Sequence, residues 1–464
     1  MAHRQTQPET RPPLFEQYCK KIQIRTTMDS YGTTARIITI LNHVAALRNF
    51  IDPRKNQLKF VCCWTWNIFL ILMVAVVQFR VELYVLQRMP LNIEHFAYIF
   101  QYVTHAFGYT STVIIGLYQS KNALRLMEQI DRVDENLKNL GIEIDYRRLS
   151  RHVKIVGSFW LLNAIIILGI FIAWVVRTII PLSCSSTFTY IYITNAQSIV
   201  LYDYNTAIFW LGSRFKVINQ LLKTLLPEDD ERNTMESNEK FIFKPSSNFR
   251  NRLEIDCSVS ARSSEVSQTS SMNDTSNFKK GSPTDGKLYL LQQIRSLHLQ
   301  VCSVSKLVNQ MFNVQILIYT FTTLVYISIS TYWIYMEIQR KTDVVEKLDL
   351  VLIFLLDGVV GSLKIAVMSY DCEYTMGQAS KMIDLIHSCT LYQESAELKD
   401  ETLQFLWQIS YTQLEDTNSV RYILNYGFVR DCLYFVLTYL VIMIQLSQNL
   451  TKNDQINITN GTIF

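Results

Sequence analysis

Seven long apolar runs, separated by strongly polar segments, constrain this chain more than any other feature. Six of the runs carry no charged residue: Phe60 to Phe79, Phe96 to Ser120, Ile155 to Val176, Thr178 to Tyr202, Leu307 to Met336 and Cys432 to Thr451. A helix of about 20 apolar residues crosses the hydrocarbon layer of a bilayer. The seventh run, Leu348 to Tyr370, is interrupted only by Asp357 and Lys364. The pattern predicts an all-α polytopic membrane protein with seven transmembrane helices.

The composition agrees with alternating membrane and aqueous segments. Hydrophobic residues make up 49% of the 464 residues, yet the mean hydropathy is only +0.11. Polar blocks must therefore offset the apolar runs. The first 59 residues are polar and basic without an early apolar core, so we expect no cleavable signal peptide.

The distribution of positive charge predicts the orientation. Ten lysines and arginines precede the first run and fourteen lie between the fourth and fifth, whereas the segments on the alternate side carry seven in total. Membrane proteins retain basic loops in the cytosol. The N-terminus is therefore expected to be cytosolic and the C-terminus extracellular, which is the reverse of a G-protein-coupled receptor.

The predicted outer surface is short loops without an ectodomain. Only Cys184 of the nine cysteines falls in an outer loop, so no extracellular disulfide can form within the chain. The C-terminal tail contains glycosylation triplets, of which those at Asn457 and Asn460 are the candidates for modification.

Helices four and five are predicted to continue beyond the membrane. The segments Arg214 to Leu226 and Leu288 to Gln310 keep an apolar period of three or four, with charges off that face. The period is carried by Leu291, Ile294, Leu297, Val301, Val304 and Val308. Lys381 to Ile386 and Leu398 to Ile409 are candidate partners for this face. Together they predict a cytosolic helical anchor bundle, whereas Ala35 to Phe50 is an amphipathic stretch expected to lie along the inner face of the membrane.

The end of the chain carries the most specific motif. Residues 438–446 read TYLVIMIQL, and residues 425–433 before them read NYGFVRDCL. The first string resembles the TYhhhhhQF signature (h, hydrophobic) of insect gustatory receptors, and the second resembles the Gly-Phe turn that precedes it. The seven helices, the inside N-terminus, the long second cytosolic loop and the short tail match that family as well.

The resemblance implies a fold similar to that of insect odorant receptors, which are homotetrameric or heterotetrameric ligand-gated cation channels. In such a channel the second half of the last helix lines the pore, the other helices surround a ligand pocket, and the anchor bundles join the subunits. Gln445 and Leu446 match the signature positions expected to form the gate, with Leu446 replacing phenylalanine. Thr438 and Tyr439 are expected to hold the pore helix against its neighbours.

A polar stripe supports this interpretation. Thr438, Ile442 and Gln445 are spaced at i, i+4 and i+7, so they share one helix face. The alternative is that the threonine and glutamine serve interhelical packing, as polar residues commonly do in membrane helices. Four copies of the glutamine amide would favour weak, non-selective passage of monovalent and divalent cations.

These expectations divide the chain into seven parts. They are a cytosolic segment (1–59), helices one to four of a ligand-binding transmembrane domain (60–226), a disordered cytosolic loop (227–286), helices five and six with their cytosolic extension (287–370), the anchor region with the start of helix seven (371–428), the pore helix (429–447) and an extracellular tail (448–464). The resemblance implies a plasma-membrane location on a sensory neuron dendrite or axon. Expected partners are a small tastant, the bilayer, and identical or other gustatory receptor subunits, without nucleic acid.

Asp357 is the first candidate for ligand binding. It lies nine residues into the sixth helix, roughly 13 Å deep, and a buried charge needs a cavity or a partner. Lys364 is expected to extend toward the inner surface instead. The other candidates are polar and aromatic residues of the outer half, which a membrane-interface aromatic belt would also explain: Asn195, Gln197, Tyr332, Trp333, Tyr335, Tyr98, Gln101 and Tyr102.

The ligand class stays open between two alternatives. Leu440 stands where the main sugar receptors carry glutamate after the TY pair, which leaves fructose-type and bitter receptors. The carboxylate and amides favour a hydroxyl-rich ligand. A G-protein-coupled receptor or a transporter is the alternative from another class. No catalytic constellation or metal-binding spacing is present, so we expect neither an enzyme nor a cofactor.

Overall fold

The computed structural model describes residues 31–34, 36–45, 47, 57–86, 93–142, 144–178, 181–225, 283–339, 344–387, 395–418, 424 and 426–461. Every regular element in these ranges is a helix. The short N-terminal helices are α2 (Tyr31–Thr34) and α3 (Arg36–Val44). The longer ones are α4 (Gln57–Leu86), α5 (Ile93–Tyr118), α6 (Ser120–Asn139), α7 (Tyr146–Thr178), α8 (Pro181–Leu225), α10 (Pro283–Gln339), α11 (Val344–His387), α12 (Ala396–Asn418) and α13 (Tyr426–Gly461).

Each of the seven apolar runs coincides with one long helix, namely α4, α5, α7, α8, α10, α11 and α13. Four helical segments of the described part are long and apolar enough to span a bilayer by length and composition: Tyr146–Ile170, Gly286–Gln339, Val351–His387 and Tyr426–Gln448. Their outward apolar side chains are exposed, as expected for surfaces that face lipid. The chain is therefore an all-helical, multi-pass membrane protein.

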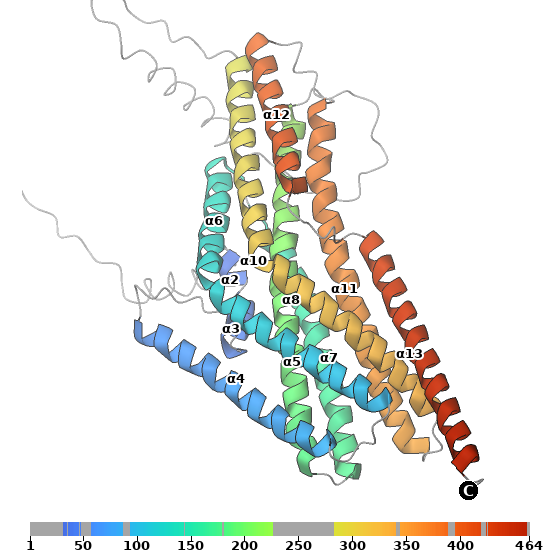
Figure 1. Cartoon of the computed structure of the whole chain (residues 1–464). Helices are drawn as coiled ribbons and strands as arrows, with labels where there is room; N and C mark the ends of the chain where they lie inside the picture. Colours follow the sequence, from blue (N-terminus) through green and yellow to red (C-terminus); the bar gives the residue numbers. More distant parts are fainter. Residues whose placement is uncertain are drawn as a thin grey trace, which may run out of the picture.

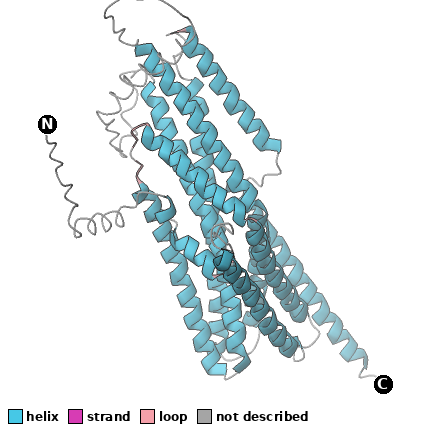
Figure 2. Cartoon of the chain, turned by 90° about the vertical axis from the view of Figure 1, so that its left-hand side faces the viewer, coloured by secondary structure: helices cyan, strands magenta, loops and turns pink. Residues whose placement is uncertain are grey.

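The helices form one elongated bundle with α8 near its centre (Figures 1 and 2). α8 packs against α11, α10, α7, α4 and α5, and α10 in turn contacts α5, α6, α12 and α13. α4 and α13 lie at opposite edges of the view in Figure 1. The last helix therefore contacts the bundle on one side, through α10 and α11.

Three helices continue well beyond the length that a membrane requires. α10 contains 57 residues, α8 contains 45 and α11 contains 44. Together with α12, their far ends form what we call the distal bundle: residues 203–225, 283–308, 371–387 and 396–418. All six residues of the predicted apolar face on α10 are buried, with exposed fractions of 0 to 2%. The predicted helical extension and its packing against α12 are confirmed.

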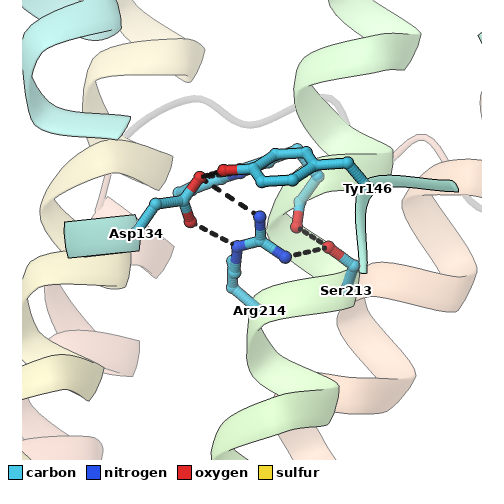
Figure 3. A network of polar contacts seen from close by, with 5 residues as sticks. Asp134, Tyr146, Ser213 and Arg214 are labelled. Atoms are coloured by element: carbon cyan, nitrogen blue, oxygen red, sulfur yellow. Dashed lines mark hydrogen bonds and ion pairs between the residues drawn. The ribbon is translucent and has the colours of Figure 1, made fainter. Parts of the chain in front are cut away.

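A buried polar network joins α6, α7 and α8 (Figure 3). The Arg214 guanidinium donates to both carboxylate oxygens of Asp134, through Nε at 2.6 Å and Nη2 at 3.2 Å. The Tyr146 hydroxyl and the Trp210 indole also donate to this carboxylate. The guanidinium lies 5.3 Å from the Tyr146 ring and 5.2 Å from the Trp210 ring. The polar contacts and the stacked rings allow a charged pair to be buried.

The described part of the amphipathic N-terminal stretch packs against other helices, a contact that the sequence did not predict. α3 packs against α8, where the Tyr192 hydroxyl donates to the Ala45 carbonyl oxygen at 3.0 Å. A Cβ atom on Gly116 of α5 would lie only 2.0 Å from the Leu47 carbonyl oxygen, so the glycine allows this close approach. Asn42 of α3 also donates to Asp203 of α8 at 3.4 Å, so this helix contacts the bundle directly.

Several predicted segments lie outside the described residues. They include residues 1–30 and most of the loop predicted at 227–286. α13 continues through the predicted tail to Gly461, and the side chains of Asn457 and Asn460 lie outside the described part.

Candidate functional site: a polar cavity among four helices

The chain contains a small polar cavity where α5, α8, α10 and α11 meet. Its lining is mostly hydroxyl, amide and charged side chains, an unusual composition for the middle of apolar helices. The lining residues are His105, Thr194, Gln197, Ser198, Tyr319, Thr322, Thr323, Tyr326, Asp357, Val360, Gly361 and Lys364. Each of these helices thus contributes to one polar site inside the bundle.

Two charged groups of α11, two turns apart on one face of the helix, line the cavity. The Asp357 carboxylate accepts a hydrogen bond from the Tyr326 hydroxyl of α10 at 2.8 Å. The Lys364 ammonium donates to the Ser198 hydroxyl of α8, also at 2.8 Å. The prediction that Lys364 extends to the inner surface is therefore wrong, because the hydrogen bond to Ser198 keeps its ammonium at the cavity.

Gln197 supplies unused hydrogen-bonding capacity. Its side chain is buried and its Nε2 atom has no hydrogen-bond partner in the described part of the chain. The Thr194 hydroxyl, one turn earlier on α8, likewise has none there. A buried donor without a partner costs about 1–3 kcal/mol. A polar molecule in the cavity would remove this cost.

Glycines permit the close packing around the cavity. A Cβ atom on Gly108 of α5 would lie 2.5 Å from Gln197 Nε2 and 2.7 Å from Thr322 Cγ2. On α11, a Cβ atom on Gly361 would lie 3.3 Å from Ile327 of α10. The helices therefore approach each other at these positions because no side chain separates them.

The cavity volume is about 30 Å³. This volume holds about two water molecules, since each water molecule needs a cavity of roughly 10–15 Å³. A sugar or alkaloid is several times larger than water. A ligand of that size does not fit into the cavity as the structure shows it.

The structure brings together only part of the predicted ligand set. Asp357 and Gln197 both line the cavity. Asn195 turns away, since its Nδ2 atom donates to the Ile191 carbonyl of its own helix at 2.7 Å. Tyr332 is fully buried in a cluster with the last helix, and Trp333 packs against the same cluster. The remaining candidates, Tyr335, Tyr98, Gln101 and Tyr102, are half-buried and do not line this cavity.

Sequence reasoning missed His105, the α10 residues and Lys364, although a signal was present. On α10 the polar residues Tyr319, Thr322, Thr323 and Tyr326 are spaced at i, i+3, i+4 and i+7. Asp357, Gly361 and Lys364 follow the same spacing on α11. Such spacing places residues on one helix face. A search for polar stripes within the apolar runs would have found most of the cavity.

The residues predicted for the pore and gate occupy two faces of α13. Tyr439 is half-buried and packs, with Met443, against Val325, Ile329 and Tyr332 of α10. Thr438, Ile442 and Gln445 are exposed on another side of the helix. Leu446 is also exposed, but its spacing of i+7 from Tyr439 and i+3 from Met443 places it on their face. The Thr438 hydroxyl donates to the Tyr434 carbonyl at 2.8 Å. The polar stripe thus faces away from the subunit to which it belongs.

α10 contacts both regions. Tyr326 reaches Asp357 in the cavity, while the neighbouring Val325, with Ile329 and Tyr332, packs against Met443 of α13. The Ser447 hydroxyl additionally lies 3.8 Å from the Met336 sulfur. A displacement of α10 at the cavity would therefore change its contacts with α13.

The fold and the cavity define a class of protein, namely a multi-pass helical membrane protein with an internal polar site. The family model described as "7tm Chemosensory receptor" matches residues 35–450. The chain belongs to this chemosensory receptor family. It is accordingly a membrane receptor and not an enzyme.

Individual relatives agree with this assignment. The chain is 19% identical over 371 residues to "Putative gustatory receptor 28b" of Drosophila melanogaster, covering 78% of this chain and 72% of that protein. Its fold is similar to that of the insect olfactory receptor OR5 from Machilis hrabei. The TM-score is 0.58 for the complex with eugenol, at 9% identity over 89% of this chain and 97% of the other. It is 0.53 for a second structure of the same olfactory receptor, at 10% identity over 92% of this chain and 99% of the other.

Proposed function

We propose that the chain is a gustatory receptor that acts as a tastant-gated, non-selective cation channel in the plasma membrane. The observation that carries the proposal is the polar cavity, which lies one helix away from the exposed polar stripe of α13. The similarity to a gustatory receptor and to olfactory receptor structures supports it. In this function the tastant separates the cavity helices, and α10 transmits the displacement to α13.

The proposed ligand is a small, neutral, hydroxyl-rich molecule such as a sugar of the fructose type. The cavity offers a carboxylate acceptor at Asp357, ammonium and amide donors at Lys364 and Gln197, and several hydroxyl groups. The two opposite charges balance, so a neutral ligand leaves no net charge buried. Bitter compounds are the alternative within the family.

The proposed assembly is a tetramer, composed of identical subunits or shared with other gustatory receptor subunits. Two exposed surfaces of the single chain support it. α12 exposes Leu403, Trp407 and Tyr411 at a spacing of four residues, which is an apolar stripe suited to a subunit interface. α13 exposes Ile442 and Leu446 beside Gln445, which four-fold symmetry would bring around a central pore. A ring of leucines would close such a pore by excluding water.

Expressing the chain alone and recording membrane current during application of sugars and bitter alkaloids tests this function. Leu446→Ala should raise the current without ligand, because the smaller side chain widens and wets the closed constriction. Leu446→Phe should stay closed at rest and serves as the matched control. Gln445→Ala should change conductance or reversal potential more than ligand sensitivity.

Two results would overturn the proposal. If all three substitutions alter only the half-response concentration, α13 is not the pore. An N-terminal tag that is accessible on intact cells would contradict the proposed orientation and favour a G-protein-coupled receptor.

A further inference from the structure

A basic face occupies the first two turns of α7. Arg147, Arg151 and Lys154 are exposed and spaced at i, i+4 and i+7, so they share one side of the helix. None of these three side chains forms an ion pair with another described residue. Three uncompensated positive charges therefore lie within about 10 Å along the helix axis, at 1.5 Å per residue.

The same side of α7 becomes apolar immediately afterwards. Ile155 is 63% exposed, and Leu162 and Ile165 further along are each 57% exposed. These side chains belong to the segment Tyr146–Ile170, which is apolar enough to cross a membrane by length and composition and has the three basic residues at its start. The basic face thus lies where the membrane boundary falls on this helix. Its length of about 10 Å is comparable to one headgroup layer, roughly 5–8 Å thick.

The opposite side of this part of α7 is fixed to the protein. Tyr146, Leu149 and Val153 are buried in the main core, and the Tyr146 hydroxyl donates to Asp134 in the network of Figure 3. His152, which directly precedes Val153, has its Nε2 atom 3.4 Å from the buried Asp371 carboxylate of α11. The basic face is therefore presented by a rigid helix start and cannot turn inward to find a carboxylate.

We infer that this face of α7 binds the phosphate-bearing headgroup of an anionic lipid in the inner leaflet. The occupant follows from charge complementarity and from continuity with the lipid-facing apolar surface. Clustered basic residues directly beside a membrane helix attract anionic lipids, at about 1 kcal/mol per residue. Three such residues on one face suit a headgroup with several phosphates, as in a phosphoinositide, better than one with a single charge. The inference uses the proposed orientation of the chain but not its ligand or channel activity.

A binding measurement on the purified full-length receptor in detergent tests the inference. The probe is dioctanoyl phosphatidylinositol bisphosphate, and its retention is measured by native mass spectrometry. The combined variant Arg147→Gln, Arg151→Gln and Lys154→Gln should weaken binding at least about tenfold. The matched control removes three exposed charges from α6 of the same connection: Lys121→Gln, Arg125→Gln and Arg132→Gln. The control should change binding less than about twofold.

Further measurements distinguish a lipid headgroup from a soluble phosphate compound and test whether the variants fold. Dioctanoyl phosphatidylserine should bind more weakly than the phosphoinositide, and soluble inositol trisphosphate should bind more weakly than the lipid. Tighter binding of the soluble compound, or equal losses in the two triple variants, would overturn the inference. The single variant Arg151→Glu, with elution volume checked by size exclusion, supplies the test if the triple variant does not fold. Unchanged binding in a folded variant would also overturn it.

Discussion

The Asp134–Arg214 network and the polar cavity each contain opposite charges inside the described part of the helix bundle, and they are built differently. In the Asp134–Arg214 network, the carboxylate accepts hydrogen bonds from Arg214, Tyr146 and Trp210, and two aromatic rings flank the guanidinium. In the cavity, Asp357 and Lys364 bind Tyr326 and Ser198, while the neighbouring Gln197 amide has no partner in the described part of the chain and about 30 Å³ stays open. In the Asp134–Arg214 pair, the protein supplies the hydrogen-bond partners of both charged groups. The cavity with Asp357 and Lys364 leaves hydrogen-bonding capacity and space for another molecule.

This difference separates structural from functional use of buried charge. A carboxylate whose partners are all supplied by the protein holds three helices together and gains nothing from a ligand. A charged pair beside an unsatisfied donor is costly until a polar molecule arrives. We therefore expect damage to the first pair to appear in stability and damage to the second to appear in the ligand response.

The largest effect should come from removing the cation of the complete network. Arg214→Met leaves Asp134 buried without its main partner, a change that typically costs about 3–5 kcal/mol. We expect a lower melting temperature and a lower yield of monodisperse receptor in detergent. The matched control is Arg430→Met, which breaks the exposed Arg430–Asp431 pair, with side chains 68% and 67% exposed. Exposed pairs contribute about 0–1 kcal/mol, so equal melting temperatures for the two variants would refute the distinction.

A smaller and different effect is expected from Asp357→Asn. If its carboxylate accepts hydrogen bonds from the ligand, the half-response concentration should rise about tenfold, because a hydrogen bond to a charged group contributes about 1.5–3 kcal/mol. The melting temperature should change less than in Arg214→Met. The comparison is made by recording dose-response curves and melting curves on the same variants.

Tyr326→Phe sharpens this test. It removes the donor to Asp357 but retains the carboxylate, so its effect on the half-response concentration should be smaller than that of Asp357→Asn. Equal effects from the two variants would mean that Asp357 serves only to pair with Tyr326, which is the structural alternative.

Sequence reasoning predicted the long helices and the distal bundle well, because both depend on the periodicity of apolar residues within one helix. Val301 and Val308 are buried as their spacing requires. The cavity was predicted less completely. Its lining depends on how four helices are rotated against each other, and the sequence of one helix does not determine that rotation. Asn195 and Gln197 are two residues apart on α8, yet one bonds its own helix and the other lines the cavity. The contact of α3 with α8 was not predicted, because amphipathicity fits a membrane surface and a groove between helices equally well.

The smallest effect is expected from adding one methyl group to the cavity wall. In Gly108→Ala the new Cβ atom would lie 2.5 Å from Gln197 Nε2 and 2.7 Å from Thr322 Cγ2, so both side chains must shift. Overpacking of this kind costs about 1 kcal/mol or more, which corresponds to about a fivefold rise in the half-response concentration. Gly358→Ala is the matched control, because nothing lies within 4 Å of its added Cβ atom although it follows Asp357 directly. A dose-response curve that shifts equally in both variants would show that the response reflects general helix packing. If the half-response concentration shifts in Gly108→Ala alone, the ligand binds beside Gln197 and Thr322. These residues line the cavity, the polar region that has unused hydrogen-bonding capacity.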